Sequence, residues 1–184
     1  MEATEAQLAL DQIRLATEQT RRAVARSGTG WVFIIWGCVW FVGYLGSQFL
    51  TGPQSGVLWL VLDILGGIAT AIVGGRTGRR VRSAYGWRVA GLWLALMAYV
   101  GLLVWIAWPM PADRLILFIT VAISFGYVFL GLWLSPVLLW TGVALTALAI
   151  LGWWLMPAYL GYWIAFLGGG GLIGLGIYIL RAWK

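Results

Sequence analysis

The chain has 184 residues, of which 62% are apolar and only 10% are charged. A water-soluble domain carries roughly 25% charged residues, so this composition excludes a soluble globular protein and indicates a protein solvated by lipid. The net charge of +6 does not indicate nucleic-acid binding, because the basic residues gather beside apolar runs and not among base-stacking aromatic side chains on a soluble surface.

The first segment is polar and helical in character. Residues 3–26 lack glycine and proline and are rich in helix formers, with a narrow apolar stripe at helical spacing. We expect residues 1–28 to form an N-terminal cytoplasmic amphipathic helix. It lies on the inner leaflet or under its own bundle in one interpretation, and docks a partner subunit or a second copy in the other. Its acidic residues are untypical of a signal peptide, so the first span is expected to be retained.

Six apolar runs follow, each close to the 20 or so residues that a hydrocarbon layer of roughly 30 Å requires. The runs show no alternation, which indicates α-helices and not barrel strands. The predicted spans are 31–50, 55–75, 88–108, 113–134, 136–156 and 159–180. The predicted fold is therefore all-α, a polytopic membrane bundle of six spans within residues 29–184. Ser135 is expected to cap the fifth span, with Pro136 at its first position.

Charge placement predicts the threading. Eleven of the 12 basic residues fall in the N-terminal segment, the 76–88 loop or the C-terminus, which lie on one side if there are six spans. Positive charge marks the cytoplasmic side, so both termini are expected there. The loop residues expected to orient the chain and contact anionic headgroups are Arg76, Arg79, Arg80, Arg82 and Arg88. On the opposite side, Asp113 is expected to cap a helix and Arg114 to anchor at the interface.

An internal repeat of three helical hairpins is predicted over 31–75, 88–134 and 136–180. Each odd span carries a glycine, each outer tip a proline, and each even span a pattern of small residues. The even-span markers are Gly66–Ile68–Ala71, Gly126–Val128–Gly131 and Gly171–Ile173–Gly176. Small residues let membrane helices approach closely. The positions expected to do so are Gly37, Gly66, Gly67, Ala71, Gly91, Gly126, Gly131, Gly142, Gly170, Gly171, Gly174 and Gly176.

This pattern resembles the HdeD-like family of small six-span membrane proteins. It is carried by "WGCVWFVGYLGSQFLTGP", "AGLWLALMAYVGLLVWIAWP" and "TGVALTALAILGWWLMP" in the odd spans, and by "LGGIATAIVGG", "SFGYVFLGLWL" and "GGGLIGLGIYIL" in the even spans. The resemblance covers residues 31–180. It implies a protein of the bacterial plasma (inner) membrane, associated in some members with acid stress, and it supplies no catalytic residues. The N-terminal helix is longer than the family pattern.

Enzymatic chemistry has few residues to use. The chain has no histidine and one cysteine, Cys38, which excludes imidazole catalysis, His-ligated haem and iron–sulfur sites. Only Asp63 and Asp113 are carboxylates outside the N-terminal segment, too few for a calcium or two-metal site. We therefore expect a protein without catalytic residues, metal or cofactor.

Residues 31–50, 57–75, 89–112 and 115–180 contain one carboxylate between them, Asp63, which lies about 9 Å along a helix from Val57. Three interpretations compete. It is a structural residue bonded to Thr120, Ser124, Thr141 or an aromatic donor. It is a proton-binding site. Or it contacts a partner subunit or ligand from the outside of the bundle.

These observations lead to three functional hypotheses. The first is a non-enzymatic scaffold or accessory subunit of a membrane complex, bound to another membrane protein or to itself. The second is a small proton-linked transporter or acid-responsive protein that uses Asp63. The third, weaker, is a binder of a lipid, quinone or pigment between aromatic helices. The tryptophans considered for that role are Trp36, Trp40, Trp93, Trp105 and Trp140.

Overall fold

The computed structural model describes residues 28–50, 52–78 and 86–182, together with Gln7. The predicted N-terminal helix lies outside the described residues except for Gln7 and Gly28, as do Arg79, Arg80 and Arg82. The helices are α2 (Thr29–Gly46), α3 (Pro53–Gly78), α4 (Gly86–Ala107), α5 (Ala112–Leu134), α6 (Pro136–Leu155), η1 (Pro157–Tyr159), α7 (Leu160–Trp163), η2 (Ile164–Gly169) and α8 (Gly170–Ala182).

The described part of the chain is all-α and contains six helical stretches long and apolar enough to cross a membrane. The first five correspond to α2 through α6, and the sixth runs from η1 to α8. A helix of this length and apolarity satisfies its backbone hydrogen bonds internally, which is what the hydrocarbon layer demands. The predicted six-span helical bundle is confirmed, and the chain is a multi-pass integral membrane protein.

Two predicted helix ends differ from the structure. The first span ends at Gly46, because Ser47, Gln48 and Phe49 turn the chain with backbone bonds to residues 43–46. The predicted capping by Asp113 is wrong: Pro111 is the N-cap of α5, and no side chain caps it. The predicted cap of α6 is confirmed, because the Ser135 hydroxyl accepts a bond from the Val137 N–H at 3.3 Å.

The last span is less regular than the single helix that its sequence indicates. It begins with the short turn η1, continues through α7, widens into the π-helix η2 and resumes as α8. The wide turn includes two of the four consecutive glycines, Gly168 and Gly169, and both are buried. A β-carbon on Gly169 would lie 2.7 Å from the backbone nitrogen of Phe41, so η2 brings its backbone directly against α2.

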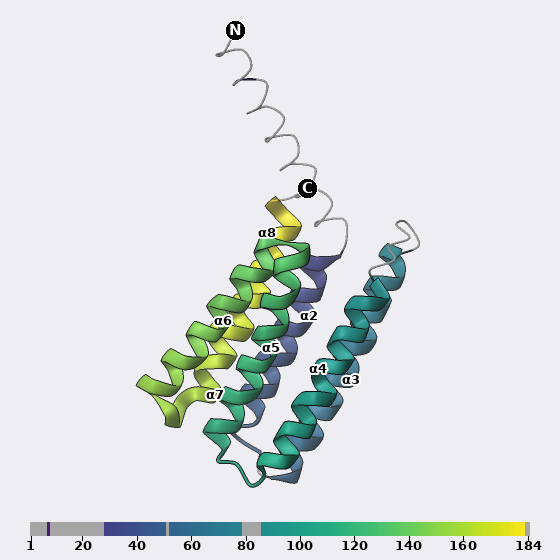
Figure 1. Ribbon diagram of the computed structural model, residues 1–184. Helices are drawn as coiled ribbons and strands as arrows, with labels where there is room; N and C mark the ends of the chain where they lie inside the picture. The colour runs from purple at the N-terminus through teal and green to yellow at the C-terminus, as the bar shows by residue number, and fades with distance from the viewer. Residues whose placement is uncertain (1–6, 8–27, 51, 79–85, 183–184) are drawn as a thin grey trace.

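The helices form two regions, which we call the central body and the outer pair (Figure 1). In the central body, α2 packs on η2 and α8, α6 packs on α5, and α7 touches α2, α5 and α6. The outer pair is α3, which packs on α2, and α4, which packs on α5. Only 6% of the spanning window is buried in each helix of the outer pair, against 22–39% in the other four spans.

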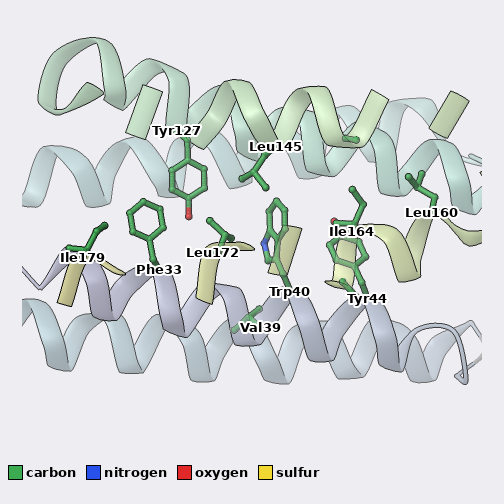
Figure 2. Close-up of a cluster of buried hydrophobic side chains, with 12 residues drawn as sticks. Phe33, Val39, Trp40, Tyr44, Tyr127, Leu145, Leu160, Ile164, Leu172 and Ile179 are labelled. Carbon is green, nitrogen blue, oxygen red and sulfur yellow. The ribbon is translucent and has the colours of Figure 1, made fainter. Parts of the chain in front are cut away.

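The core lies inside the central body (Figure 2). Phe33 of α2 and Tyr127 of α5 stack across it, with ring centroids 5.9 Å apart. Trp40 and Tyr44 continue the row along α2, and Leu172 of α8 faces them. Because these side chains come from the first, fourth and last spans, they fix α2 and α5 relative to each other through contacts distant in sequence.

The ends of the bundle separate into two sets. The start of α2, the end of α3, the start of α4, the α5–α6 turn and the end of α8 lie at one end, and the remaining connections lie at the other (Figure 1). Arg76 in α3, Arg88 in α4 and Arg181 in α8 belong to the first end, and Asp113 belongs to the second.

Candidate functional site

The candidate site is identified by comparison with two places at which helices of the chain cross closely. In the first, α2 crosses the last span. A β-carbon added to Gly37 would lie 2.8 Å from the carbonyl oxygen of Gly169 and 2.8 Å from the backbone nitrogen of Ile173. One turn further along, a β-carbon on Gly176 would lie 2.5 Å from the carbonyl oxygen of Gly30 and 3.0 Å from the nitrogen of Ile34. Glycine at both places is what lets the two backbones touch.

The second crossing, between α6 and α5, uses the same register. A β-carbon on Gly142 would lie 2.6 Å from the carbonyl oxygen of Ser124 and 2.7 Å from the nitrogen of Val128. A β-carbon on Gly131 would meet the backbone of Leu139. Gly142 thus stands to Val128 as Gly37 stands to Ile173, and all four residues are marker positions of the predicted repeat.

The same marker positions recur in one further pair of spans, α4 and α3, which do not form a close crossing in the structure. Gly91 of α4 occupies the position of Gly37 and Gly142, yet a β-carbon there would meet nothing within 4 Å. Ala71 of α3 occupies the position of Gly131 and Gly176 and is exposed. The two helices do not pack closely on each other along their described lengths. The third crossing is therefore open.

The residue three positions after the central glycine of each odd span shows how differently the three spans are buried. Trp40 in α2 is 3% exposed and Leu145 in α6 is 4% exposed. The corresponding residue of α4, Leu94, is 73% exposed. The equivalent apolar position is therefore buried in α2 and α6 and exposed in α4. We call the uncovered surface the seam; it consists of Ile64, Ile68 and Ala71 of α3 and Gly91, Leu94, Ala95 and Ala98 of α4.

The twelve predicted packing positions divide into those that lie against a neighbouring helix and those that do not. Six have a neighbouring helix where a β-carbon would be: Gly37, Gly66, Gly126, Gly131, Gly142 and Gly176. Five glycines meet nothing within 4 Å: Gly67, Gly91, Gly170, Gly171 and Gly174. These five glycines and the exposed Ala71 have no packed neighbour within the described chain, so the expectation that they bring helices together stays a prediction. The Gly170–Gly174 pair lies on the outer side of α8.

Each helix of the outer pair is held by its own hairpin neighbour. On the α2–α3 contact, the Trp36 indole donates to the Thr70 hydroxyl at 3.1 Å, and the Trp59 indole donates to the Ser47 hydroxyl at 2.9 Å. On the α4–α5 contact, Trp93 and Leu96 pack over Gly126. These contacts fix one side of each helix and leave the seam side uncovered.

Asp63 lies on α3, about 15 Å along it from Pro53 at 1.5 Å per residue. The expected 9 Å is counted from Val57, and α3 begins four residues earlier. Its side chain is exposed in the single chain, and it has no hydrogen-bond or ion-pair partner among the described residues. It is near enough to Tyr44 for the two to interact electrostatically. An exposed carboxylate fits the alternative in which Asp63 contacts something outside its own chain.

The residues expected to bond Asp63 use their hydroxyls elsewhere. Thr120 pairs with the Tyr44 hydroxyl at 2.8 Å, and the Ser124 hydroxyl donates to the Thr120 carbonyl at 2.7 Å. Thr141 donates to the Val137 carbonyl within its own helix at 2.7 Å. The interpretation of Asp63 as a residue bonded to these side chains is therefore wrong. Thr120 and Ser124 instead form a buried polar cluster with Tyr44 that ties α2 to α5.

The remaining predicted residues do not assemble into a second site. Arg76 and Arg88 are exposed at the same end of the bundle, as the predicted topology requires of them. Trp40 is in the core, Trp36 and Trp93 pack against it from α2 and α4, and Trp105 and Trp140 are exposed on the outside. The five tryptophans considered for a pigment or quinone site therefore do not gather. Asp113 accepts a bond from the Trp153 indole at 3.1 Å.

No known protein family, curated protein or solved structure matches the chain. The resemblance to HdeD-like proteins rests on the pattern of glycines and prolines alone.

The sequence reasoning missed the Tyr44–Thr120 pair and the close contacts at Gly43 and Gly46. Gly43 admits the Trp59 ring and Gly46 admits Leu58, so both fix α3 on α2. A signal for these two was present in the spacing, since Gly43 and Gly46 continue the helical face of Val39 and Trp36, which contact Gly66. Tyr44 and Thr120 are 76 residues apart, and no local pattern pairs them.

Proposed function

We propose that this chain is a non-enzymatic scaffold or accessory subunit of a membrane complex, in the bacterial inner membrane with both termini in the cytoplasm. The observation that carries the proposal is the seam: two adjacent spans present a surface that is buried at both equivalent crossings. Asp63 on α3 adds to it, since it has no hydrogen-bond or ion-pair partner among the described residues and carboxylates in membrane helices normally face protein or water.

The test is purification of the tagged full chain in mild detergent. The expected result is a second subunit in a fixed ratio, another membrane protein or a differently tagged second copy, that itself retrieves this chain. Replacing Leu94 with Arg on the seam should release that subunit, whereas the matched change Ile150→Arg, on an exposed position of α6, should not. Equal release by both variants, or a chain that purifies as a lone monomer, contradicts the proposal. Deletion of residues 1–28 asks separately whether the N-terminal segment contributes.

A second candidate function is proton-linked transport or acid response through Asp63. The specific observation in its favour is a carboxylate without a hydrogen-bond partner among the described residues, close to the Tyr44–Thr120 pair. Asp63→Asn should then abolish a pH-dependent flux or acid-survival phenotype at unchanged expression. The matched control is Asp113→Asn at the other carboxylate. If Asp63→Asn keeps the full pH-dependent flux or acid survival, this function is excluded.

The proposed orientation has its own test. A green fluorescent protein fused after Lys184 should fluoresce, and alkaline phosphatase fused there should be inactive, because the end of α8 lies with Arg76, Arg88 and Arg181. The opposite pair of results would reverse the orientation and place the basic end of the bundle outside the cytoplasm.

A further inference from the structure

We infer that the seam is a self-association surface, at which α3 of one copy packs on α4 of a second copy and α4 packs on the second copy's α3. This inference rests on the proposed function and names one partner for the seam. The two crossings that the chain forms, α2 with the last span and α6 with α5, show which kind of helix packs on faces like those of α3 and α4.

The face of α3 accepts a helix with a central glycine. At its equivalent positions, Val128 receives Gly142, and Ile173 receives Gly37. Ile68 stands at this position on α3, and it is 53% exposed. The chain has one odd span whose central glycine is unoccupied, and that span is α4, with Gly91. The helix that fits α3 is therefore α4.

The face of α4 carries small residues against which a second helix can pack. Gly91 leaves room for a backbone, and Ala95 and Ala98 continue the small-residue face along the helix, all three without close cover. The equivalent of Ala95 in α2 is Phe41, whose backbone lies against Gly169 at the first crossing. The unoccupied face that matches this one is that of α3.

The two faces do not meet within one chain because each helix is anchored elsewhere. The Trp36–Thr70 bond and the Gly66 contact hold α3 on α2, and the Gly126 contact holds α4 on α5. The stacked pair Phe33–Tyr127 in turn fixes α2 against α5. Closing the seam internally would have to move these packed contacts.

A second copy related by a twofold axis along the membrane normal brings both pairs together at once. Such an axis keeps each residue at its own membrane level, and the register of the two crossings within the chain then sets Ile68 of one copy against Gly91 of the other, twice. An isologous contact of this kind closes after two subunits. Ala71 adds a methyl group where Gly131 and Gly176 have none, so this crossing is wider than the two within the chain.

Cysteine cross-linking between two differently tagged full-length chains tests the inference. Both carry Cys38→Ala, because Cys38 is exposed. One carries Ile68→Cys and the other Gly91→Cys, and the two are co-expressed and oxidised in native membranes. The expected product has twice the chain mass and carries both tags, since a disulfide needs β-carbons about 4 Å apart. The matched control replaces Gly91→Cys by Leu132→Cys, an exposed position at the same end of α5.

Two outcomes overturn the inference. The first is absence of the mixed product above the control, which assigns the seam to lipid or to another protein. The second comes from a single chain carrying both cysteines: a cross-link confined to the monomer means that the chain closes its own seam.

A second measurement does not depend on cysteine. In nanodiscs, native mass spectrometry should show dimers for the wild-type chain and at least a tenfold lower dimer fraction for Ala95→Leu. Ala147→Leu, the same change on an exposed position of α6, should retain the dimer. A wild-type chain that is monomeric in nanodiscs yet co-purifies with another subunit removes this inference and leaves the proposed function. A wild-type chain that is monomeric and co-purifies with nothing removes both.

Discussion

The central body and the outer pair are built from the same kind of apolar helix, yet only one of them is closely packed. Gly37 and Gly142 let backbones touch in the central body, whereas Gly91 in the outer pair meets nothing within 4 Å. In lipid, apolar side chains gain little by leaving their surroundings for one another, so packing geometry decides which helices associate. The comparison teaches that a glycine in a membrane helix is a packing residue only when a matching backbone is opposite it.

The largest expected difference between the regions is at the equivalent glycines. Gly142→Leu should abolish the folded protein, because its β-carbon alone would overlap the Ser124 carbonyl and the forced separation of α5 and α6 costs several kcal/mol. Gly91→Leu should leave the monomer folded. The measurement is the monodisperse fraction after detergent extraction and the midpoint of thermal unfolding. Similar losses for both variants would erase the distinction between the regions.

A carboxylate should be tolerated in one region and not in the other. Ile123 is the repeat equivalent of Asp63 and packs against the core. Ile123→Asp should destabilise the protein by about 3 kcal/mol, the cost of placing a charged side chain in a membrane helix. Asp63→Ile should keep or raise stability, since it removes an acid without a bonded partner among the described residues. Resistance to unfolding by dodecyl sulfate compares the two, and a marked loss in Asp63→Ile would contradict this account.

The polar cluster in the central body should give a smaller effect. Tyr44→Phe removes the 2.8 Å hydroxyl pair with Thr120 while keeping the ring, which packs edge-on against Trp40 and Trp59. The expected loss is about 1 kcal/mol in the free energy of unfolding. Tyr99→Phe, on an exposed position of α4, is the control and should be silent. The same unfolding curves report both changes, and equal curves would mean that water or lipid replaces the bond.

The smallest expected effect concerns the attachment of the outer pair. Trp36→Phe removes the indole bond to Thr70 and should cost about 0.6 kcal/mol. Since α3 is one of the two least buried spans among the described helices, the change should appear as faster amide exchange in α3 with little effect on α8. Trp140→Phe, on the exposed side of α6, serves as the control. Faster exchange throughout the molecule would show that α3 is part of the same cooperative unit as the body.

Much of the architecture was predictable, because apolar run length and charge placement report directly on the lipid environment. The six spans and the Ser135 cap follow from local sequence and agree with the structure. The wide turn at Gly168 and Gly169 was not predictable, since glycine permits an irregular helix without requiring one. It lies where the backbone of Phe41, from a span more than a hundred residues away, approaches Gly169.

The candidate site was predictable only in part. Asp63 stands out in sequence as a lone acid, but its exposure depends on which faces of α3 the other helices cover, which no local pattern encodes. The glycine pattern marked Gly91 together with Gly37 and Gly142, and composition alone could not separate the occupied positions from the empty one. The three-dimensional arrangement supplies that distinction, because it shows which backbone lies opposite each glycine.

The pairing of α2 with the last span also has a consequence for how the protein is made. At a synthesis rate of roughly 5–20 residues per second, α2 enters the bilayer several seconds or more before η2 and α8 leave the ribosome. Throughout that interval Gly37 has no backbone opposite it, and the insertion machinery or lipid must shield the helix. A ribosome that stalls before Gly168 therefore leaves behind an inserted chain whose first helix is orphaned, a natural substrate for membrane quality-control proteases.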